Sequence, residues 1–91
     1  MKTLLSEKDF SEEYRLIGLN IAYYRKLRHL TQLELAEKVG ISRTHMSNIE
    51  APNIPTSVSL EVLLKISKVL EIPPAKLLNF PLEEHRTFKS E

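Results

Sequence analysis

The chain has 91 residues, of which 42% are hydrophobic and 27% charged, and its formal net charge is +1. A chain of this length folds as one small domain and leaves no room for a separate catalytic or ligand-binding domain. It has no cysteine, which excludes disulfides and thiolate metal sites and fits a reducing cytoplasm, where we expect the protein to act. We expect no signal peptide, because the only apolar pair near the N-terminus, Leu4-Leu5, stands among charged residues. No apolar run approaches the roughly 20 residues that cross a membrane.

An enzyme is not expected. The three histidines, His29, His45 and His85, fall on different predicted elements, and no Cys/His or carboxylate spacing suggests a metal or a nucleophile. The only two glycines, Gly18 and Gly40, cannot form a glycine-rich phosphate loop. We therefore expect no catalytic residue, metal, cofactor or small-molecule substrate.

The first ten residues are expected to form a flexible or loosely docked arm. A helix then starts near Ser11, with Glu12 and Glu13 in its first turn, and runs to about Arg28. This helix carries two apolar stripes about 120° apart, although a surface helix of a monomer usually needs one. The first stripe consists of Tyr14, Ile17, Ile21 and Tyr24, and the second of Leu16, Leu19, Tyr23 and Leu27.

Two explanations of the second stripe remain open. In one, the N-terminal arm folds over the stripe through Leu4, Leu5 or Phe10. In the other, the stripe contacts another subunit.

The next stretch, from Leu30 to Glu50, predicts two short helices joined by a tight turn. Thr31 is a good cap for a helix from Gln32 to Lys38, and Gly40 follows where a left-handed residue would end it. Ser42 then caps a second helix that runs to about Glu50. The inward-facing residues are Leu35, Ala36, Val39, Ile41, Met46 and Ile49, whereas Thr44, Ser47 and Asn48 lie on the opposite side of the second helix. A helix with one buried face and short polar side chains on the other suits a major groove, so we interpret this stretch as a helix-turn-helix.

The remainder of the chain predicts a loop and two more helices. Residues 51–58 contain two prolines within four residues and cannot continue a helix. Ser59 caps a fourth helix, with Leu60, Leu63, Leu64, Ile66 and Leu70 apolar and Glu61, Lys65 and Lys68 solvated. Pro74 opens a short fifth helix to about Asn79, and residues 81–91 form a charged tail. The fold class is therefore all-α, with five helices in one domain over residues 11–80.

At these residues the chain resembles the phage-repressor type of helix-turn-helix, the Cro and lambda-repressor-like (XRE-type) DNA-binding family. The resemblance rests on Leu30-Thr31-Gln32, Glu34-Leu35-Ala36, Val39-Gly40-Ile41-Ser42 and Ile49-Glu50, and extends more loosely from Ile17 to Leu78. It implies a compact five-helix lambda-repressor-like fold whose helices 2 and 3 form the helix-turn-helix.

The resemblance implies base contacts from Arg43, Thr44 and Asn48, and their chemistry agrees. Arginine can pair bidentately with guanine, asparagine with adenine, and the threonine methyl can touch a thymine methyl. Ser47 is a fourth candidate, short enough to act only through water. Arg43 could instead lie along the backbone as a phosphate clamp.

Phosphate contacts are expected at the edge of this face. Gln32 stands at the start of helix 2, where its side chain and the free amides of the helix suit a phosphate oxygen. The resemblance also pairs Arg25 with Glu50 in an ion pair that holds the arginine near a phosphate. The remaining phosphate candidates are Arg28, the rim residue His45, and Asn53 in the loop after helix 3.

That loop departs from the family, because residues 51–55 carry no charge where relatives commonly have basic or glycine residues. With a net charge of only +1, we expect modest affinity and a shallow salt dependence.

The expected function is that of a sequence-specific double-stranded-DNA-binding transcriptional regulator, a repressor, which inserts helix 3 in the major groove of a palindromic operator as a homodimer. In related domains the dimer contact involves helix 5 and the residues after it, here Leu77, Leu78, Phe80 and Leu82, with the second stripe of helix 1 as the competing surface. The alternative is a protein-interaction module, antitoxin-like or a subunit of a larger regulator. Thr44, Ser47 and Asn48 argue against it, because a protein-binding face is expected to carry large apolar anchors.

Overall fold

The structure is a computed structural model, and it describes residues 4–5 and 7–80. Over these residues the chain forms a short 3-10 helix, five α-helices and no strand, so the predicted all-α class is confirmed. The elements are η1 (Glu7–Phe10), α1 (Ser11–Leu27), α2 (Gln32–Val39), α3 (Arg43–Glu50), α4 (Leu60–Leu70) and α5 (Pro74–Leu77). The predicted tail, with Leu82, lies outside the described residues, as do residues 1–3 and 6 of the predicted arm.

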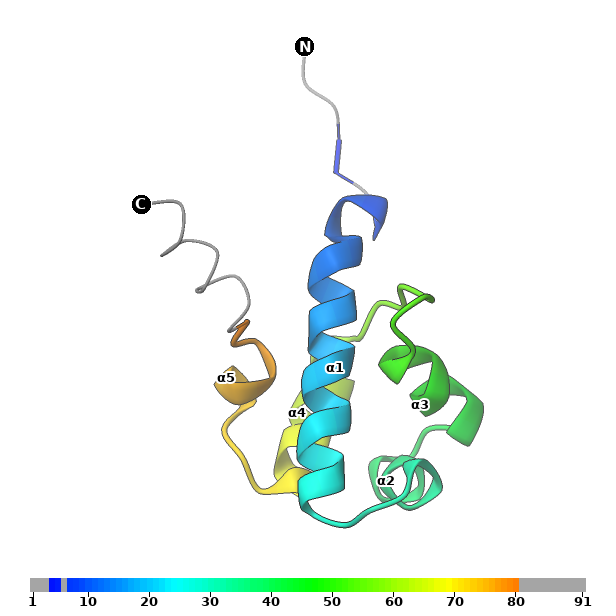
Figure 1. The fold of residues 1–91 in the computed structure, drawn as a ribbon, viewed down its shortest axis with the longest axis vertical. Helices are drawn as coiled ribbons and strands as arrows, with labels where there is room; N and C mark the ends of the chain where they lie inside the picture. The colour runs from blue at the N-terminus through cyan, green and yellow to red at the C-terminus, as the bar shows by residue number, and fades with distance from the viewer. Residues whose placement is uncertain (1–3, 6, 81–91) are drawn as a thin grey trace.

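The central element of the fold is α1, which packs against α3, α4 and α5. In Figure 1 α4 lies behind α1, α2 and α3 lie on one side of it, and α5 lies on the other. All five α-helices contribute to a single core, which consists of Ile17, Ile21, Leu35, Ala36, Val39, Met46, Ile49, Leu63, Ile66, Leu70 and Leu77. None of the helices in the described part of the chain combines the length and apolar content that crossing a bilayer requires.

Local signals set the bounds of the helix-turn-helix, as predicted. The Thr31 hydroxyl accepts the Glu34 N–H at 3.0 Å and the Glu34 carboxylate accepts the Thr31 N–H at 2.8 Å, a complete capping box at the start of α2. Gly40 ends α2 in the left-handed region, with φ 91°. Ser42 caps α3 by accepting the His45 N–H at 2.9 Å.

The two ends of α1 show features that the sequence did not indicate. The helix begins at Ser11 as predicted, but η1 precedes it where a plain arm was expected. At the other end α1 stops at Leu27, and His29 adopts φ 60°, a left-handed conformation that is uncommon outside glycine. The Leu30 N–H then bonds the Arg25 carbonyl at 3.1 Å, which satisfies an end group of the helix and turns the chain toward α2.

The second stripe of α1 is largely exposed. Leu16 is buried, but Leu19, Tyr23 and Leu27 are 37%, 58% and 56% exposed. Leu4 and Leu5 are 89% and 71% exposed, so the hypothesis that they cover this stripe is wrong.

Two of the apolar residues of α4 lie outside the core. Its cap is as expected, because the Ser59 hydroxyl accepts the Val62 N–H at 3.1 Å. Leu60 and Leu64, however, are exposed, because the inward arc of the helix is filled by Leu63, Ile66, Ser67 and Leu70 at i, i+3, i+4 and i+7. The small Ser67 is only 2% exposed and its hydroxyl donates to the Leu64 carbonyl at 2.8 Å.

The last helix, α5, is shorter than predicted and is held by α1. It ends at Leu77, and Asn20 donates its side-chain amide to the Leu77 carbonyl at 3.0 Å and to the Asn79 carbonyl at 2.8 Å. Leu77 is fully buried in the core of its own chain. Its assignment to a dimer interface is therefore wrong. Leu78 is 48% exposed, and Phe80 is half-buried against the core.

At Gly18 the backbone of α1 lies close to the end of α3. A Cβ at this position would clash with the main-chain carbonyl of Ile49 and come within 3.3 Å of the Glu50 Cα. These are backbone atoms, so neither can move aside like the end of a flexible side chain. The glycine is what lets the two helices lie this close.

Gly18→Ala is expected to lower the free energy of unfolding by about 1–3 kcal/mol, the usual effect of overpacking. The sign of this change is informative. At an open helical position alanine would instead raise the free energy of unfolding by about 1 kcal/mol relative to glycine. Chemical denaturation measures the change, with Lys68→Ala, at an exposed position of α4, as a control that should stay within about 0.5 kcal/mol. An unchanged or more stable Gly18→Ala variant would contradict the close crossing of α1 and α3.

Candidate nucleic-acid interface

One face of α3 is buried and the other carries exposed polar side chains. Met46 and Ile49 are in the core, as the sequence predicts. Arg43, Thr44 and His45 are exposed in the first turn, and Ser47 and Asn48 are half-buried one turn later. The outer face of α3 thus presents an arginine, an asparagine and short hydroxyl side chains, while the opposite face of the helix packs in the core.

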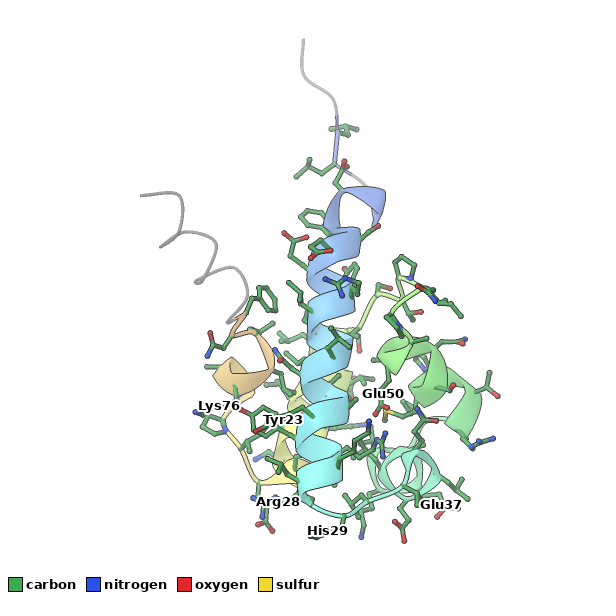
Figure 2. The ribbon with its side chains drawn as sticks, in the orientation of Figure 1. Tyr23, Arg28, His29, Glu37, Glu50 and Lys76 are labelled. Atoms are coloured by element: carbon green, nitrogen blue, oxygen red, sulfur yellow. The ribbon has the colours of Figure 1, made fainter. Side chains whose placement is uncertain are left out.

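The end of α3 is fixed by a buried carboxylate. Glu50 is 6% exposed and Arg25 is 8% exposed. Arg25 Nε donates to Glu50 Oε2 at 2.7 Å, and Arg25 Nη2 donates to Glu50 Oε1 at 2.9 Å, a bidentate pair of two parallel hydrogen bonds. In Figure 2 Glu50 lies between α1 and α3, so this pair joins the two helices.

A third helix joins at the same carboxylate. Gln32, the first residue of α2, donates its Nε2 to Glu50 Oε1 at 2.9 Å. Arg25 Nη1 also donates to the Leu30 carbonyl at 2.7 Å, in the turn that leads into α2. We call Arg25, Gln32, Glu50 and the Leu30 carbonyl the Glu50 network. Every buried side-chain nitrogen and oxygen in the described residues has a hydrogen-bond partner, so the network is complete.

The network changes the role expected for Arg25. The predicted ion pair with Glu50 is present, but three of the guanidinium N–H groups are already bonded inside the protein. At 8% exposure its guanidinium offers little surface to a phosphate, and the assignment of Arg25 as a phosphate ligand stays a prediction. Its bonds to Glu50 hold the end of α3 against α1.

Gln32 is half-buried at the open end of α2. One side-chain N–H is engaged by Glu50, and the second can still be donated outward. The main-chain N–H groups of Gln32 and Leu33 belong to the first turn, where a helix has no acceptor of its own. The positive end of α2 therefore lies beside α3, an arrangement suited to a phosphate oxygen.

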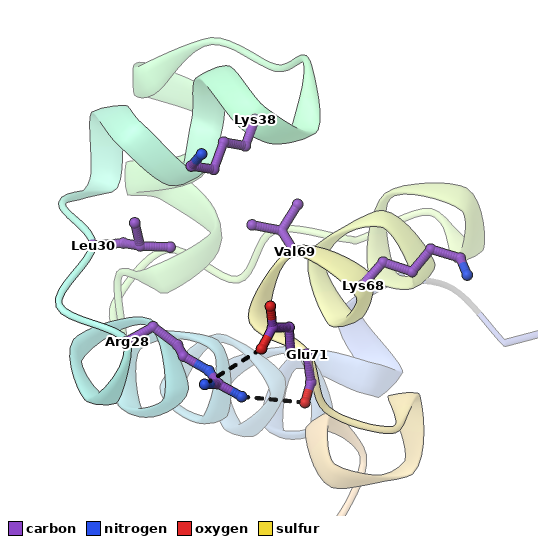
Figure 3. A pocket seen from close by; sticks show the side chains of 6 residues that line it. All are labelled: Arg28, Leu30, Lys38, Lys68, Val69 and Glu71. Atoms are coloured by element: carbon purple, nitrogen blue, oxygen red, sulfur yellow. Dashed lines mark hydrogen bonds and ion pairs between the residues drawn. The ribbon is translucent and has the colours of Figure 1, made fainter.

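Arg28 lies elsewhere. Its Nε donates to the Leu70 carbonyl at 2.7 Å, its Nη2 to the Glu71 carbonyl at 3.3 Å, and its Nη1 lies 3.6 Å from the Glu71 carboxylate. Figure 3 shows the contacts with Glu71 in a hollow of about 510 Å³ lined by Arg28, Leu30, Lys38, Lys68, Val69 and Glu71. Arg28 is engaged at the C-terminal end of α4, and because its side chain is still 44% exposed, its assignment as a phosphate ligand stays a prediction. Glu71 itself ends α4 in a left-handed conformation.

The other candidate phosphate ligands are accessible. His45 is exposed in the first turn of α3, and Asn53 is exposed in the loop between α3 and α4. No group of three or more His, Asp or Glu side chains among the described residues is placed to hold a metal ion.

Comparison with known proteins places this geometry in a family. Residues 21–77 match the model of the family described as helix-turn-helix. Over 72 residues, 79% of the chain, it is 39% identical to the HTH-type transcriptional regulator SinR of Bacillus subtilis, and it spans 61% of that protein's length. It is 41% identical to the antitoxin PezA of Streptococcus pneumoniae serotype 4 over 77% of the chain, spanning 46% of that protein.

A solved structure agrees with these relatives. The crystal structure of SinR, the master regulator for biofilm formation, in complex with DNA is 40% identical to the chain with a TM-score of 0.64, over 69% of this chain and 98% of that one.

The chain belongs to the helix-turn-helix family of the Cro/C1 (XRE) type. This is a family of DNA-binding transcription regulators rather than of enzymes. The compact five-helix fold predicted from the resemblance is confirmed.

Sequence reasoning missed the structural roles of three residues. Gln32 was expected only at the DNA, yet it also bonds Glu50. Asn20 was given no role, yet it holds α5. Gly18 was considered only as part of a phosphate loop, and a glycine within an otherwise strong helical pattern is the signal that could have indicated a close crossing.

Glu50→Ala is expected to lower the free energy of unfolding by about 3 kcal/mol or more, because it leaves the Arg25 charge buried without its partner. The matched control is Glu61→Ala, which removes the exposed ion pair with Lys65 (3.2 Å) and should cost at most about 1 kcal/mol. Urea denaturation of both variants measures the difference. Equal, small losses would show that the Glu50 network does not hold α3.

Proposed function

We propose that the chain is a sequence-specific transcriptional repressor of the cytoplasm that binds double-stranded DNA as a homodimer. The α3 helix enters the major groove of each half of a palindromic operator. The outer face of α3 is the single observation that carries this proposal, because its exposed and half-buried side chains are those that hydrogen-bond base edges.

Base contacts are assigned to Arg43, Thr44, Ser47 and Asn48. Arg43 and Thr44 lie in the first turn of α3 and Asn48 lies one turn on, so all three are on the part of the helix that a groove receives. The Glu50 network supports this assignment, because it fixes the helix in relation to α1 and α2 before DNA arrives. Side chains held in this way lose less conformational freedom on binding.

Phosphate contacts are assigned to Gln32 with the first amides of α2, and to His45 and Asn53. Only His45 can carry a charge among these groups, and the loop of residues 51–58 contains no charged residue. Each ionic phosphate contact steepens the salt dependence of binding by about one unit of logarithmic slope. The repressor should therefore lose affinity with salt less steeply than a strongly basic domain.

The relatives support the same function. SinR is named an HTH-type transcriptional regulator, and its structure in complex with DNA matches this chain over 98% of that structure's length. One α3 covers only about 4 to 6 base pairs, so two half-sites about one turn apart are needed for useful specificity. This requirement supports the homodimer.

The second candidate function is an antitoxin-like protein-interaction module, and the 41% identity to the antitoxin PezA favours it. In that case the outer face of α3 would bind protein. Its side chains are short and polar, whereas protein interfaces depend on large apolar or aromatic anchors. DNA binding is the better match.

Selection of binding sites from random duplex DNA, at low and near-physiological salt, tests the proposal. An enriched inverted repeat with a fixed spacing is the expected result. Retention without a consensus would refute sequence-specific binding, and no retention even at low salt would refute DNA binding and favour a protein partner.

Asn48→Ala is expected to relax the base preference at one position, with a loss of about 1–3 kcal/mol on the selected site. Gln32→Ala should instead weaken all duplexes alike, since phosphates carry no sequence information. Fluorescence anisotropy with the selected site and with single-base variants of it separates the two effects. Identical profiles for the two variants would overturn the assigned roles, and a thermal melt of Gln32→Ala controls for the loss of its bond to Glu50.

A further inference from the structure

The exposed apolar stripe of α1 has no partner within the described chain. Leu19, Tyr23 and Leu27 follow one another at i, i+4 and i+8, and each is more than one-third exposed. On the α5 side the stripe borders a groove of about 430 Å³ whose lining includes Leu16, Tyr23 and Phe80. At the C-terminal end of the helix it borders a second hollow of about 360 Å³, lined in part by Leu27 and Ile72. The two hollows flank the stripe along α1, and in Figure 2 Tyr23 and Lys76 lie on the same side of this helix.

Charged residues of opposite sign stand at the two ends of this stripe. Glu12 and Lys26 lie seven residues before and seven residues after Leu19. Seven residues are close to two helical turns, so both side chains fall within about 20° of Leu19 around the helix. Along the axis they are about 21 Å apart, at a rise of 1.5 Å per residue. Glu12 also bonds Arg15 at 2.8 Å, in an exposed ion pair of the kind that contributes little and can be exchanged for another. The surface is thus apolar in the middle, with the Glu12–Arg15 ion pair at one end and Lys26 at the other.

We infer that this surface, the α1 stripe, binds the same surface of a second copy of the chain, with the two α1 helices antiparallel and crossing at Leu19. This inference rests on the proposed function only in that it names the interface of the proposed homodimer. A two-fold axis at Leu19 places Glu12 of each copy opposite Lys26 of the other, so the charge pair forms twice. The apolar side chains between them are removed from water.

The charge pattern selects this arrangement over others. A parallel pair of α1 helices would put Glu12 opposite Glu12 and Lys26 opposite Lys26, so neither residue would meet an opposite charge of its partner and the two lysines would repel each other. The competing dimer surface at α5 has lost Leu77 to the core, which leaves Leu78 as its exposed apolar side chain within the described residues. A second copy also fits better than an unrelated helix, because the stripe is complementary to itself about a two-fold axis.

The expected dimer is weak in the absence of DNA. The 17 residues of α1 form a helix about 26 Å long and 10 Å wide. Its footprint of roughly 260 Å² is well below the approximately 800 Å² per partner of a standard interface, even with the flanking hollows added. Monomer and dimer should therefore exchange, and DNA that engages two half-sites should favour the dimer.

The test exchanges the two charges. Glu12→Lys alone gives lysine opposite lysine and Lys26→Glu alone gives glutamate opposite glutamate, so each variant should self-associate about tenfold more weakly than the wild type. An equimolar mixture of the two variants restores both Lys–Glu pairs in a heterodimer, which should form within about threefold of the wild-type affinity. Sedimentation equilibrium of the full chain measures all three association constants.

Mixing separates association from folding, because it changes no residue in either variant. The control pair is Glu61→Lys and Lys68→Glu, which make the same charge changes on exposed positions of α4. These variants, alone or mixed, should associate as the wild type does. A mixture of Glu12→Lys and Lys26→Glu that associates no better than its components would overturn the inference, and so would a wild type that stays monomeric at hundreds of micromolar.

The variant Leu19→Glu tests whether self-association and DNA binding use different surfaces. It should abolish self-association while leaving binding to a duplex with one half-site unchanged, because α3 is not involved. If Leu19→Glu remains dimeric, the α1 stripe is not the interface. If the wild type dimerises through the stripe but binds no duplex, the proposed function fails while the interface stands.

Discussion

The structure depends on one interaction, the burial of the Glu50 carboxylate between three helices. An ionised carboxylate at 6% exposure is costly unless each oxygen is hydrogen-bonded, and here Arg25 and Gln32 supply three bonds of 2.7 to 2.9 Å. A buried ion pair contributes little to stability compared with an apolar contact of the same size. Its effect is directional, because the guanidinium donates two parallel hydrogen bonds to the carboxylate in one geometry only. Gly18 permits this geometry by letting the backbone of α1 reach the end of α3.

This constraint connects the core to the outer face of α3. Met46 and Ile49 hold one side of the helix in the core, and Glu50 fixes its end against α1 and α2. These contacts fix the backbone of Arg43, Thr44 and Asn48 relative to the first turn of α2. In the proposed complex the bases and the adjacent phosphate are therefore met by one rigid unit, and less freedom is lost on binding. The α1 stripe, on another face of α1, then sets the distance between two such units in the proposed dimer.

How much the sequence could predict depended on whether the determinant was local. The caps Thr31, Ser42 and Ser59 and the left-handed Gly40 act within three residues, and all were predicted correctly. The left-handed His29 and Glu71 were not, because no glycine marks them. Arg25 and Arg28 are similar residues three positions apart, yet one meets Glu50 and the other meets α4, and only the tertiary packing decides between them. The same holds for Leu77, since an apolar side chain at the end of a short helix suits a core and an interface equally well.

The central claim is that α3 and the start of α2, held by the Glu50 network, form the surface that DNA contacts. The most direct measurement is a titration of the ¹⁵N-labelled chain with a duplex carrying one half-site, followed by amide chemical shifts. The account predicts shifts at residues 31–34, 42–48 and 51–58, with the exposed side of α1 from Leu19 to Leu27 unaffected. Shifts confined to α1 and α5, or to the hollow around Arg28 and Lys68, would contradict it.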